Sequence, residues 1–452
     1  MDGTWTLSKA QDLIQSCMLP QLREDLDNIP IEPEHFKSYH ECLRIQLPLL
    51  YDWIEQVKPW DGCPEKNEEV DLQEAQAQVI LLLCELSVKD TLYCIDQTEL
   101  LNNAERILQR FSNVPRVVHA KLLRYYQEKL HKDTWKRQMG ATNGFVKYLK
   151  VFASSSCPDN FMDKQLLMFC LSVGLNIRTC YETHYKFLST QIFEIMLQQG
   201  NFDEILAMNI HSVIYDAIFK DLHIMDSIEF IQHQWDCLLK CFDFYNDMDS
   251  FTWSKLDDSL EILLRNIPLA PNSMSSIKLM KYVSIFLVFF NINRIEFNDC
   301  LNMDLMDIET TNKLRVLGSS NTSYTCYRWA KTILQMFILE SYRLMQNMNI
   351  CMDMLMEIHR CYVVATFPIN LAVIEPHLTT FFDKFTAVLM EVIKVQKCDK
   401  NVMQVITMIF ESFYYHLKEC NDQSKLFKYK KAYYSLLHTD TFKKYVNVKN
   451  IL

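Results

Sequence analysis

Apolar residues recur at steps of three and four along nearly the whole chain, which is the spacing of one face of an α-helix. One such stripe comprises Leu43, Leu47, Leu50, Ile54 and Val57. A second stripe at the same spacing comprises Trp253, Leu256, Leu260, Leu263, Leu264 and Ile267. Each apolar face has to pack against a neighbour. The pattern predicts about 18 to 20 helices, most of them about 12 to 20 residues long.

Helix-breaking residues interrupt this pattern at short intervals, and short connections favour antiparallel neighbours. Two longer stretches, 61–71 and 310–324, combine breakers with polar residues and are typical of loops. We expect the helices to break near residues 30–34, 59–69, 112–115, 154–158, 200, 268–276, 368 and 399.

The second loop suggests a division of the chain. We predict an N-terminal and central helical solenoid over 1–310, a linker over 311–323, and a C-terminal helical block with a basic tail over 324–452. In the last part, residues 333–339 are apolar on nearly every side, which predicts a central buried helix.

Glycine is scarce, with 7 residues in 452, so the chain has few positions suited to tight turns or phosphate loops. Leu19-Pro20-Gln21-Leu22 and Leu47-Pro48-Leu49-Leu50, and more loosely 374–378, place a proline among apolar residues, as the first helices of HEAT repeats often do. We therefore predict an all-α fold, an irregular HEAT-like α-solenoid of antiparallel helix pairs. Ordinary helix starts in an irregular helical protein stay open as the alternative, because no strict period emerges.

The composition narrows the class of protein. Apolar residues make up 49% and charged residues 23%, which is typical of a folded chain, and the net charge of -10 disfavours direct nucleic-acid binding or binding to an anionic membrane. The 16 cysteines are scattered, residues 1–12 contain no apolar leader, and the apolar block 283–290 is too short to cross a bilayer. We expect free thiols and a cytoplasmic location, with the nucleus as a second compartment.

No familiar catalytic motif is found in the sequence. Gly140 and Gly144 are followed by Phe145 where a phosphate loop needs lysine. His233, Cys237 and Cys241 share one helix face, but no second cysteine pair completes a zinc site, so buried cysteines are the simpler interpretation. We assign no catalytic, cofactor-binding or metal-binding residue and no cofactor, and predict that the protein is not an enzyme.

Asp257 and Asp258 lie near the start of a helix, about 100° apart around its axis, so they cannot act as a catalytic pair. We expect them to interact with the helix dipole and to form a salt bridge to a partner.

The C-terminal residues interleave lysine with aromatic side chains, and two interpretations are open. Tyr433, Leu436 and Leu437 fit the buried side of an amphipathic helix with lysines facing water. Alternatively, the lysines and aromatics bind nucleic acid or an acidic protein surface. As hypothetical partner-binding residues we take Lys425, Lys428, Lys430, Lys431 and Tyr429, with Phe286 and Phe290 from an outward side of the 283–290 helix.

Two blocks of the central region, 211–242 and 251–267, contain an ordered set of motifs. A Tyr-x-x-hydrophobic-Phe helix is followed by Cys-Leu-Leu, then by Trp-x-x-hydrophobic-Asp, after an upstream Trp-Lys pair. The positions of these motifs, which we expect to be mostly structural, are Trp135, Lys136, Tyr215, Phe219, Cys237, Leu238, Leu239, Trp253, Leu256, Asp257, Leu263 and Leu264. In this order the motifs resemble the Tel-two-interacting protein two (Tti-two) family, and the likeness covers about 130–344.

The resemblance implies a scaffold subunit of the Triple-T co-chaperone complex. Its implied partners are Tel-two-like and Tti-one-like proteins and the ninety-kilodalton heat-shock chaperone. Its implied clients are phosphatidylinositol-3-kinase-related kinases of the mTOR, ATM and ATR type. A HEAT-like adaptor or transport solenoid that binds protein cargo is the alternative. A helical enzyme such as a terpenoid-synthase-like bundle would need an Asp-Asp-x-x-Asp cluster, which the sequence lacks.

Overall fold

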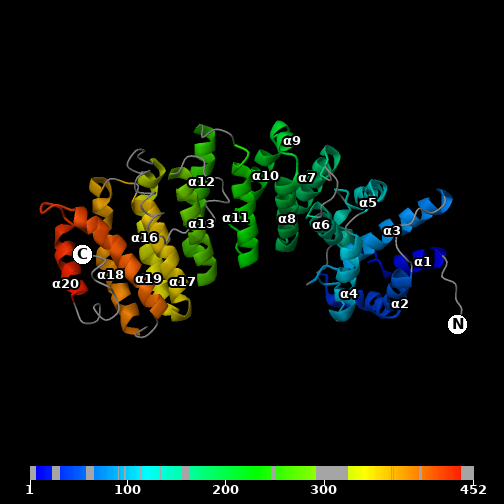
Figure 1. Cartoon of the computed structure of the whole chain (residues 1–452), viewed down its shortest axis with the longest axis horizontal. Coiled ribbons are helices and arrows are strands. Elements are labelled where there is room, and N and C mark those ends of the chain that lie inside the picture. The colour runs from blue at the N-terminus through cyan, green and yellow to red at the C-terminus, as the bar shows by residue number, and fades with distance from the viewer. Residues whose placement is uncertain are drawn as a thin grey trace. The chain divides into compact units, whose positions relative to one another are not determined.

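The computed structural model describes residues 7–22, 31–56, 66–89, 91–95, 98–111, 114–132, 134–154, 162–245, 250–291, 324–367, 369, 371–395 and 400–438. Within these ranges the chain forms 18 α-helices and five short 3-10 helices and contains no strand. The all-α prediction is confirmed, and within each part of the chain neighbouring helices pack side by side in a solenoid-like manner (Figure 1).

The chain divides into two compact units, Met1–Ala217 and Ile218–Leu452, and α10 (Ile210–Phe219) spans the division. The helices of the first unit are α1 (Leu7–Cys17), η2 (Pro33–Phe36), α2 (Lys37–Gln56), α3 (Lys66–Leu86), α4 (Thr98–Leu108), η3 (Gln109–Phe111), α5 (Arg116–Lys129), η4 (Trp135–Arg137), α6 (Met139–Ser154), α7 (Lys164–Arg178), α8 (Thr183–Gln199) and α9 (Phe202–Ala207).

Helix α3 is the centre of the first unit, because it packs against α1, α4, α5 and α6. Its residues 79–86 read VILLLCEL and are all buried, including Glu85. Further along, α6 packs on α8 and α8 on α7. The buried Arg178 joins these helices to α10, since its Nε donates to the Ala217 carbonyl and its guanidinium donates to Thr190 Oγ1.

The second unit is also built from helices. Its elements are α11 (Ile228–Phe242), α12 (Ser250–Asn266), η5 (Ile267–Leu269), α13 (Ser273–Asn291), α16 (Tyr324–Gln346), η6 (Met348–Ile350), α17 (Cys351–Thr366), α18 (Leu371–Val395), α19 (Lys400–Glu419) and α20 (Phe427–Leu437).

These helices form two rows. One row is α11, α13, α17 and α19, each packed on the next, and the other is α12, α16 and α18 (Figure 1). Successive helices in the chain alternate between the rows and pack across them, as α12 does on α13 and α16 on α17. The core lies between the rows and includes a cluster of rings from Phe337, Tyr362, Phe381, Phe385 and Phe413.

Side-chain caps explain several helix ends. Asp163 accepts a hydrogen bond from the Leu166 amide at 2.9 Å and starts α7, and Ser227 does the same for α11 through Phe230. Gly200 directly follows the last residue of α8, at the predicted break. Of the break predicted near 112–115, residues 114 and 115 lie between η3 and α5, and of the break predicted near 268–276, residues 270–272 lie between η5 and α13, whereas 273–276 belong to α13. The break predicted near 399 lies outside the described residues.

Three sequence predictions need correction. The loop predicted over 61–71 is wrong from Lys66 onward, because α3 begins there and its glutamates suit a helix. Residues 333–339 do not form a helix buried on every side, since Leu339 is 53% exposed. Of the three proline segments, Pro48 and Pro376 lie inside helices, whereas Pro20 lies in a non-helical segment after α1.

The predicted division of the chain also differs from the structure. The linker over 311–323 lies outside the described residues. The helices on its two sides belong to one compact unit, because α13 packs against both α16 and α17. The division between the units instead falls at residues 217 and 218.

Candidate functional site

The first unit buries a carboxyl group at its centre. Glu85, near the end of α3, is 2% exposed, and its Oε2 accepts a hydrogen bond of 3.3 Å from the Leu19 amide. Burial raises the pKa of Glu85 to about 7, while the Leu19 amide and the charge of Lys129 act in the opposite direction. A carboxyl group with this pKa changes its protonation near neutral pH.

Two glycines of α6 make room for this carboxyl group. A Cβ at Gly140 would lie 2.8 Å from Glu85 Oε2, and one at Gly144 would lie 3.1 Å from Glu85 Cγ. Both distances are shorter than ordinary contacts between heavy atoms. The glycine pair that lacks the lysine of a phosphate loop therefore has a packing role, which is the close approach of α6 to α3.

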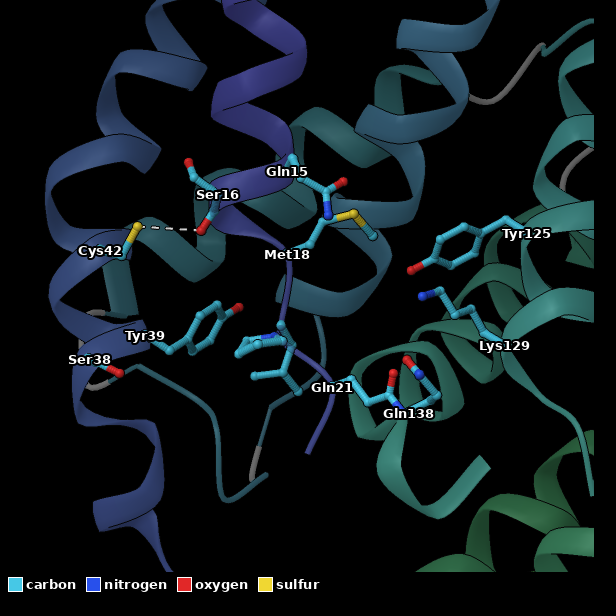
Figure 2. A pocket seen from close by; sticks show the side chains of 12 residues that line it. Gln15, Ser16, Met18, Gln21, Ser38, Tyr39, Cys42, Tyr125, Lys129 and Gln138 are labelled. Atoms are coloured by element: carbon cyan, nitrogen blue, oxygen red, sulfur yellow. Dashed lines mark hydrogen bonds between the residues drawn. The ribbon is translucent and has the colours of Figure 1, made fainter. Parts of the chain in front are cut away.

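A polar pocket of about 410 Å³ lies beside Glu85, and Leu19 belongs to both features. Figure 2 shows the Tyr125 hydroxyl and the Lys129 ammonium, both from α5, pointing into it, with Gln21 and Gln138 next to each other at one side. Its lining consists of Gln15, Ser16, Met18, Leu19, Pro20, Gln21, Ser38, Tyr39, Cys42, Tyr125, Lys129 and Gln138.

Two backbone contacts and a side chain hold the segment after α1 in place. Leu19 donates to Glu85, Leu22 donates to the Arg137 carbonyl at 3.0 Å, and the Tyr39 hydroxyl donates to the Cys17 carbonyl at 3.2 Å. Burial raises the pKa of Tyr39 and Tyr125 well above the ordinary range, so both phenols stay neutral. Lys129 is the only charged residue in the pocket lining.

Sequence reasoning missed this site. Glu85 is the single acidic residue in an otherwise apolar run, which is the one local signal that marks it. The pocket residues come from four separate segments of the chain, so no motif joins them.

The basic C-terminal helix is placed as an amphipathic helix would be. Lys425, Lys428 and Lys431 are exposed, while Tyr433 is 2% exposed and packs on Phe410 at 5.5 Å between ring centroids. The side chains of Leu436 and Leu437 lie outside the described residues.

Two residues of this helix do not have the free, exposed side chains that the partner-binding hypothesis requires. Tyr429 is not an exposed aromatic, because it is 7% exposed and its hydroxyl donates to the Thr379 carbonyl at 3.0 Å. Lys430 is half-buried, and its Nζ donates to the carbonyls of Lys418 and Cys420 at the end of α19. Lys430 therefore caps a helix C-terminus.

The prediction that Phe286 lies on an outward face of the 283–290 helix is wrong. This side chain is fully buried, with its ring 5.9 Å from Trp235 and 6.4 Å from Phe242. Helices α11, α12, α16 and α17 all pack on α13, which explains its excess of apolar residues. The side chain of Phe290 lies outside the described residues.

Most positions of the family resemblance are in the core, as expected. Trp135 is 4% exposed and packs on Tyr185 at 4.9 Å between ring centroids, whereas Lys136 is exposed. Phe219 is half-buried, and the side chain of Trp253 lies outside the described residues. The remaining fully buried positions are Tyr215, Cys237, Leu238, Leu239, Leu256, Leu263 and Leu264.

Asp257 differs from its expected role at a helix start. It lies in the third turn of α12, and its carboxylate accepts hydrogen bonds from Arg328 and from Trp329 Nε1, both on α16. The salt bridge that we expected toward a partner is therefore made within the chain.

The second unit exposes an apolar stripe that was not predicted. Leu339, Tyr342 and Met345 lie on one side of α16 and are 53%, 51% and 42% exposed. Residues at this spacing form a continuous strip along a helix. We call these three residues the α16 stripe.

Two observations concern metals and membranes. Among the described residues, no group of three or more His, Cys, Asp or Glu side chains is placed to hold a metal ion. None of the described helices combines the length and the apolar character that crossing a membrane requires. Buried Cys84, Cys170 and Cys361 are free thiols whose pKa is raised by burial, in agreement with the free-thiol prediction for these residues.

Comparison of the chain with protein-family models, with curated proteins and with solved structures finds no match.

Proposed function

We propose that this protein is a non-catalytic helical scaffold that binds other proteins. The observation that supports this proposal most directly is the α16 stripe, which lies in a row of stacked helices in the second unit. Stacked helices present long surfaces that suit large partners, and contiguous exposed apolar side chains are typical of protein-binding sites.

The particular complex is proposed from the sequence resemblance. We infer that the chain is a scaffold subunit of a Triple-T-like co-chaperone complex that supports the maturation and stability of phosphatidylinositol-3-kinase-related kinases. Its partners in this proposal are Tel-two-like and Tti-one-like proteins, together with the heat-shock chaperone machinery. The burial of Trp135, Tyr215 and Leu238 is compatible with the structural role that the resemblance assigns to them.

A HEAT-like adaptor or transport solenoid is the second candidate, since acidic net charge and stacked helices suit it equally. The two candidates differ in their partners. Affinity purification of the tagged full chain, with identification by mass spectrometry, is expected to recover Tel-two-like, Tti-one-like and kinase-related proteins. Recovery of a small nuclear GTPase or of cargo proteins without any of these would overturn the co-chaperone proposal.

The binding surface is tested with surface variants in the same purification. We expect Leu339→Ser combined with Tyr342→Ser to reduce recovery of the Tti-one-like protein. The matched control is Tyr181→Ser, because Tyr181 is an 84% exposed aromatic of the first unit. Equal recovery of the Tti-one-like protein by the double variant and by the Tyr181→Ser control would show that the α16 stripe is not part of the interface.

The basic helix is tested separately. Lys425, Lys428 and Lys431 are changed to glutamate, and Lys430 is kept because it caps α19. A reduced recovery that is stronger at low salt is expected if these lysines bind an acidic partner surface. Unchanged recovery would exclude them from the interface.

A further inference from the structure

The pocket in the first unit contains one ammonium group that makes no ion pair and no hydrogen bond with the described residues. Lys129 Nζ lies 5.8 Å from the centroid of the Tyr125 ring, and its charge acts on the buried Glu85 carboxyl without a direct contact. Lysines in polar pockets are commonly paired with a carboxylate, and here the pocket itself leaves room for one.

Neutral donors surround this ammonium group. The Tyr125 hydroxyl points into the pocket beside Lys129, and the side-chain amides of Gln21 and Gln138 lie at its edge (Figure 2). In the described part of the chain, none of these three side-chain groups makes a hydrogen bond. One cation with amide and hydroxyl donors matches the acceptor atoms of a carboxylate.

The local charge also favours an acidic ligand. Between residues 129 and 137 the sequence contains Lys129, Lys132, Lys136 and Arg137 against one acidic residue, Asp133, although the whole chain has a net charge of -10. Such a basic segment attracts acidic groups toward the mouth of the pocket.

We propose that the pocket at Lys129 binds a carboxylate side chain from an acidic segment of a partner protein. A cavity of about 410 Å³ has room for one or two side chains. Sites for small molecules are mostly apolar, whereas this lining is mostly polar, so a protein side chain is the better fit.

The proposal deepens the proposed scaffold function, because it names the chemistry of one partner segment. It concerns the first unit alone, and it is tested with defined peptides. Its failure is therefore distinguishable from failure of the co-chaperone proposal, which depends on the proteins recovered from cells.

The buried carboxyl of Glu85 supplies an independent readout. Among the described residues, the charged group that acts on Glu85 is Lys129 on α5. The neighbouring phenols of Tyr39 on α2, Tyr93 after α3, and Tyr125 and Tyr126 on α5, and the Cys84 thiol on α3, remain neutral. Gly140 and Gly144 of α6 contribute no side chain. A carboxylate bound at Lys129 raises the pKa of Glu85 by repulsion, so binding takes up protons and is tighter at pH 6 than at pH 8.

The test uses the full chain and a fluorescent peptide of alternating Glu-Glu and Gly-Ser pairs, followed by anisotropy. We expect Lys129→Gln to weaken binding about tenfold and Lys129→Arg to retain most of it. The matched control is Lys132→Gln, which removes a charge from the same basic segment outside the pocket lining and is expected to change affinity less than about twofold. Circular dichroism checks that each variant is folded.

Three outcomes would overturn the proposal. One is unchanged affinity of Lys129→Gln, and another is equal binding of a peptide with glutamine in place of glutamate. The third is full displacement of the peptide by succinate at stoichiometric amounts, which would identify the ligand as a small free acid. In Glu85→Gln we expect the difference in affinity between pH 6 and pH 8 to disappear, which a purely nonspecific charge attraction would not produce.

Discussion

The indole Nε1 of Trp329 donates a hydrogen bond of 2.6 Å to Oδ1 of Asp257, although the two residues are 72 positions apart. The same carboxylate accepts from Arg328, so one side chain of α12 is held by two neighbouring residues of α16. These hydrogen bonds hold α12 and α16, two neighbouring helices of the same row, against each other.

Asp257→Ala is expected to lower the free energy of unfolding of the second unit by about 1 to 2 kcal/mol, because the acceptor of both hydrogen bonds is lost. Chemical denaturation followed by circular dichroism measures this change. Asp258→Ala is the matched control, since Asp258 is exposed and adjacent, and it should change stability by less than about 0.5 kcal/mol. Equal effects would show that the contact is not stabilising.

Glu85 predicts a pH-dependent stability. Burial raises its pKa to about 7, whereas a glutamate in an unfolded chain titrates near about 4.3. Between these values the folded protein holds a proton that the unfolded chain has released. The contribution of Glu85 to the free energy of unfolding therefore falls as pH rises from about 4.3 through about 7, and the total loss is about 4 kcal/mol.

Glu85→Gln isolates this effect, because glutamine keeps an acceptor for the Leu19 amide and carries no charge. The variant is expected to be more stable than the parent at pH 8, with the difference shrinking toward pH 4. Thermal unfolding at several pH values measures it. Glu128→Gln, an exposed change on α5, is the control, and a similar trend for both variants would contradict the prediction.

Gly174 is expected to tolerate no side chain. A Cβ at this position would lie 2.5 Å from Cε1 of the buried Phe193 ring, and the Gly174 carbonyl accepts a hydrogen bond of 2.8 Å from Ser189 Oγ. An aromatic ring in a packed core cannot move aside easily, so Gly174→Ala should destabilise the first unit by about 1 to 3 kcal/mol. Ser172→Ala, on the exposed side of α7, is the control and should be close to neutral in a denaturant titration.

His359 is expected to stay neutral at physiological pH. It is 4% exposed, its Nε2 lies 2.7 Å from Ser412 Oγ, and burial, with a smaller contribution from Arg360, lowers its pKa to about 4. The unfolded chain takes up a proton near about 6.5 that the folded protein does not, so the contribution of His359 to stability is lost as pH falls from about 6.5 to about 4.

Nuclear magnetic resonance of the histidine ring protons tests this directly. The signals of His359 should not shift between pH 8 and pH 5. Ser412→Ala removes the hydrogen-bond partner and should cost about 1 kcal/mol at pH 7. Titration of His359 near pH 6.5 would show that the imidazole is accessible to water.

The sequence predicted those features that depend on local spacing. The steps of three and four between Leu43, Leu47 and Leu50 place all three on the buried face of α2, and Gly200 marks the end of α8. Charge runs were less informative, because Lys428 and Lys431 are solvent-facing while Lys430 between them caps another helix. Helix periodicity gives the face that a residue occupies, but not the partner that covers this face.

By itself, the sequence determined that the chain is helical, where several helices begin and end, and which stripes must be buried, since these depend on neighbours three or four residues apart. Only the tertiary structure decided that Phe286 is enclosed, that Asp257 is held by α16, and that Glu85 lies against Gly140 beside Lys129. These contacts join residues far apart in the chain. Their burial and charge interactions depend on how whole helices pack, which no local pattern encodes.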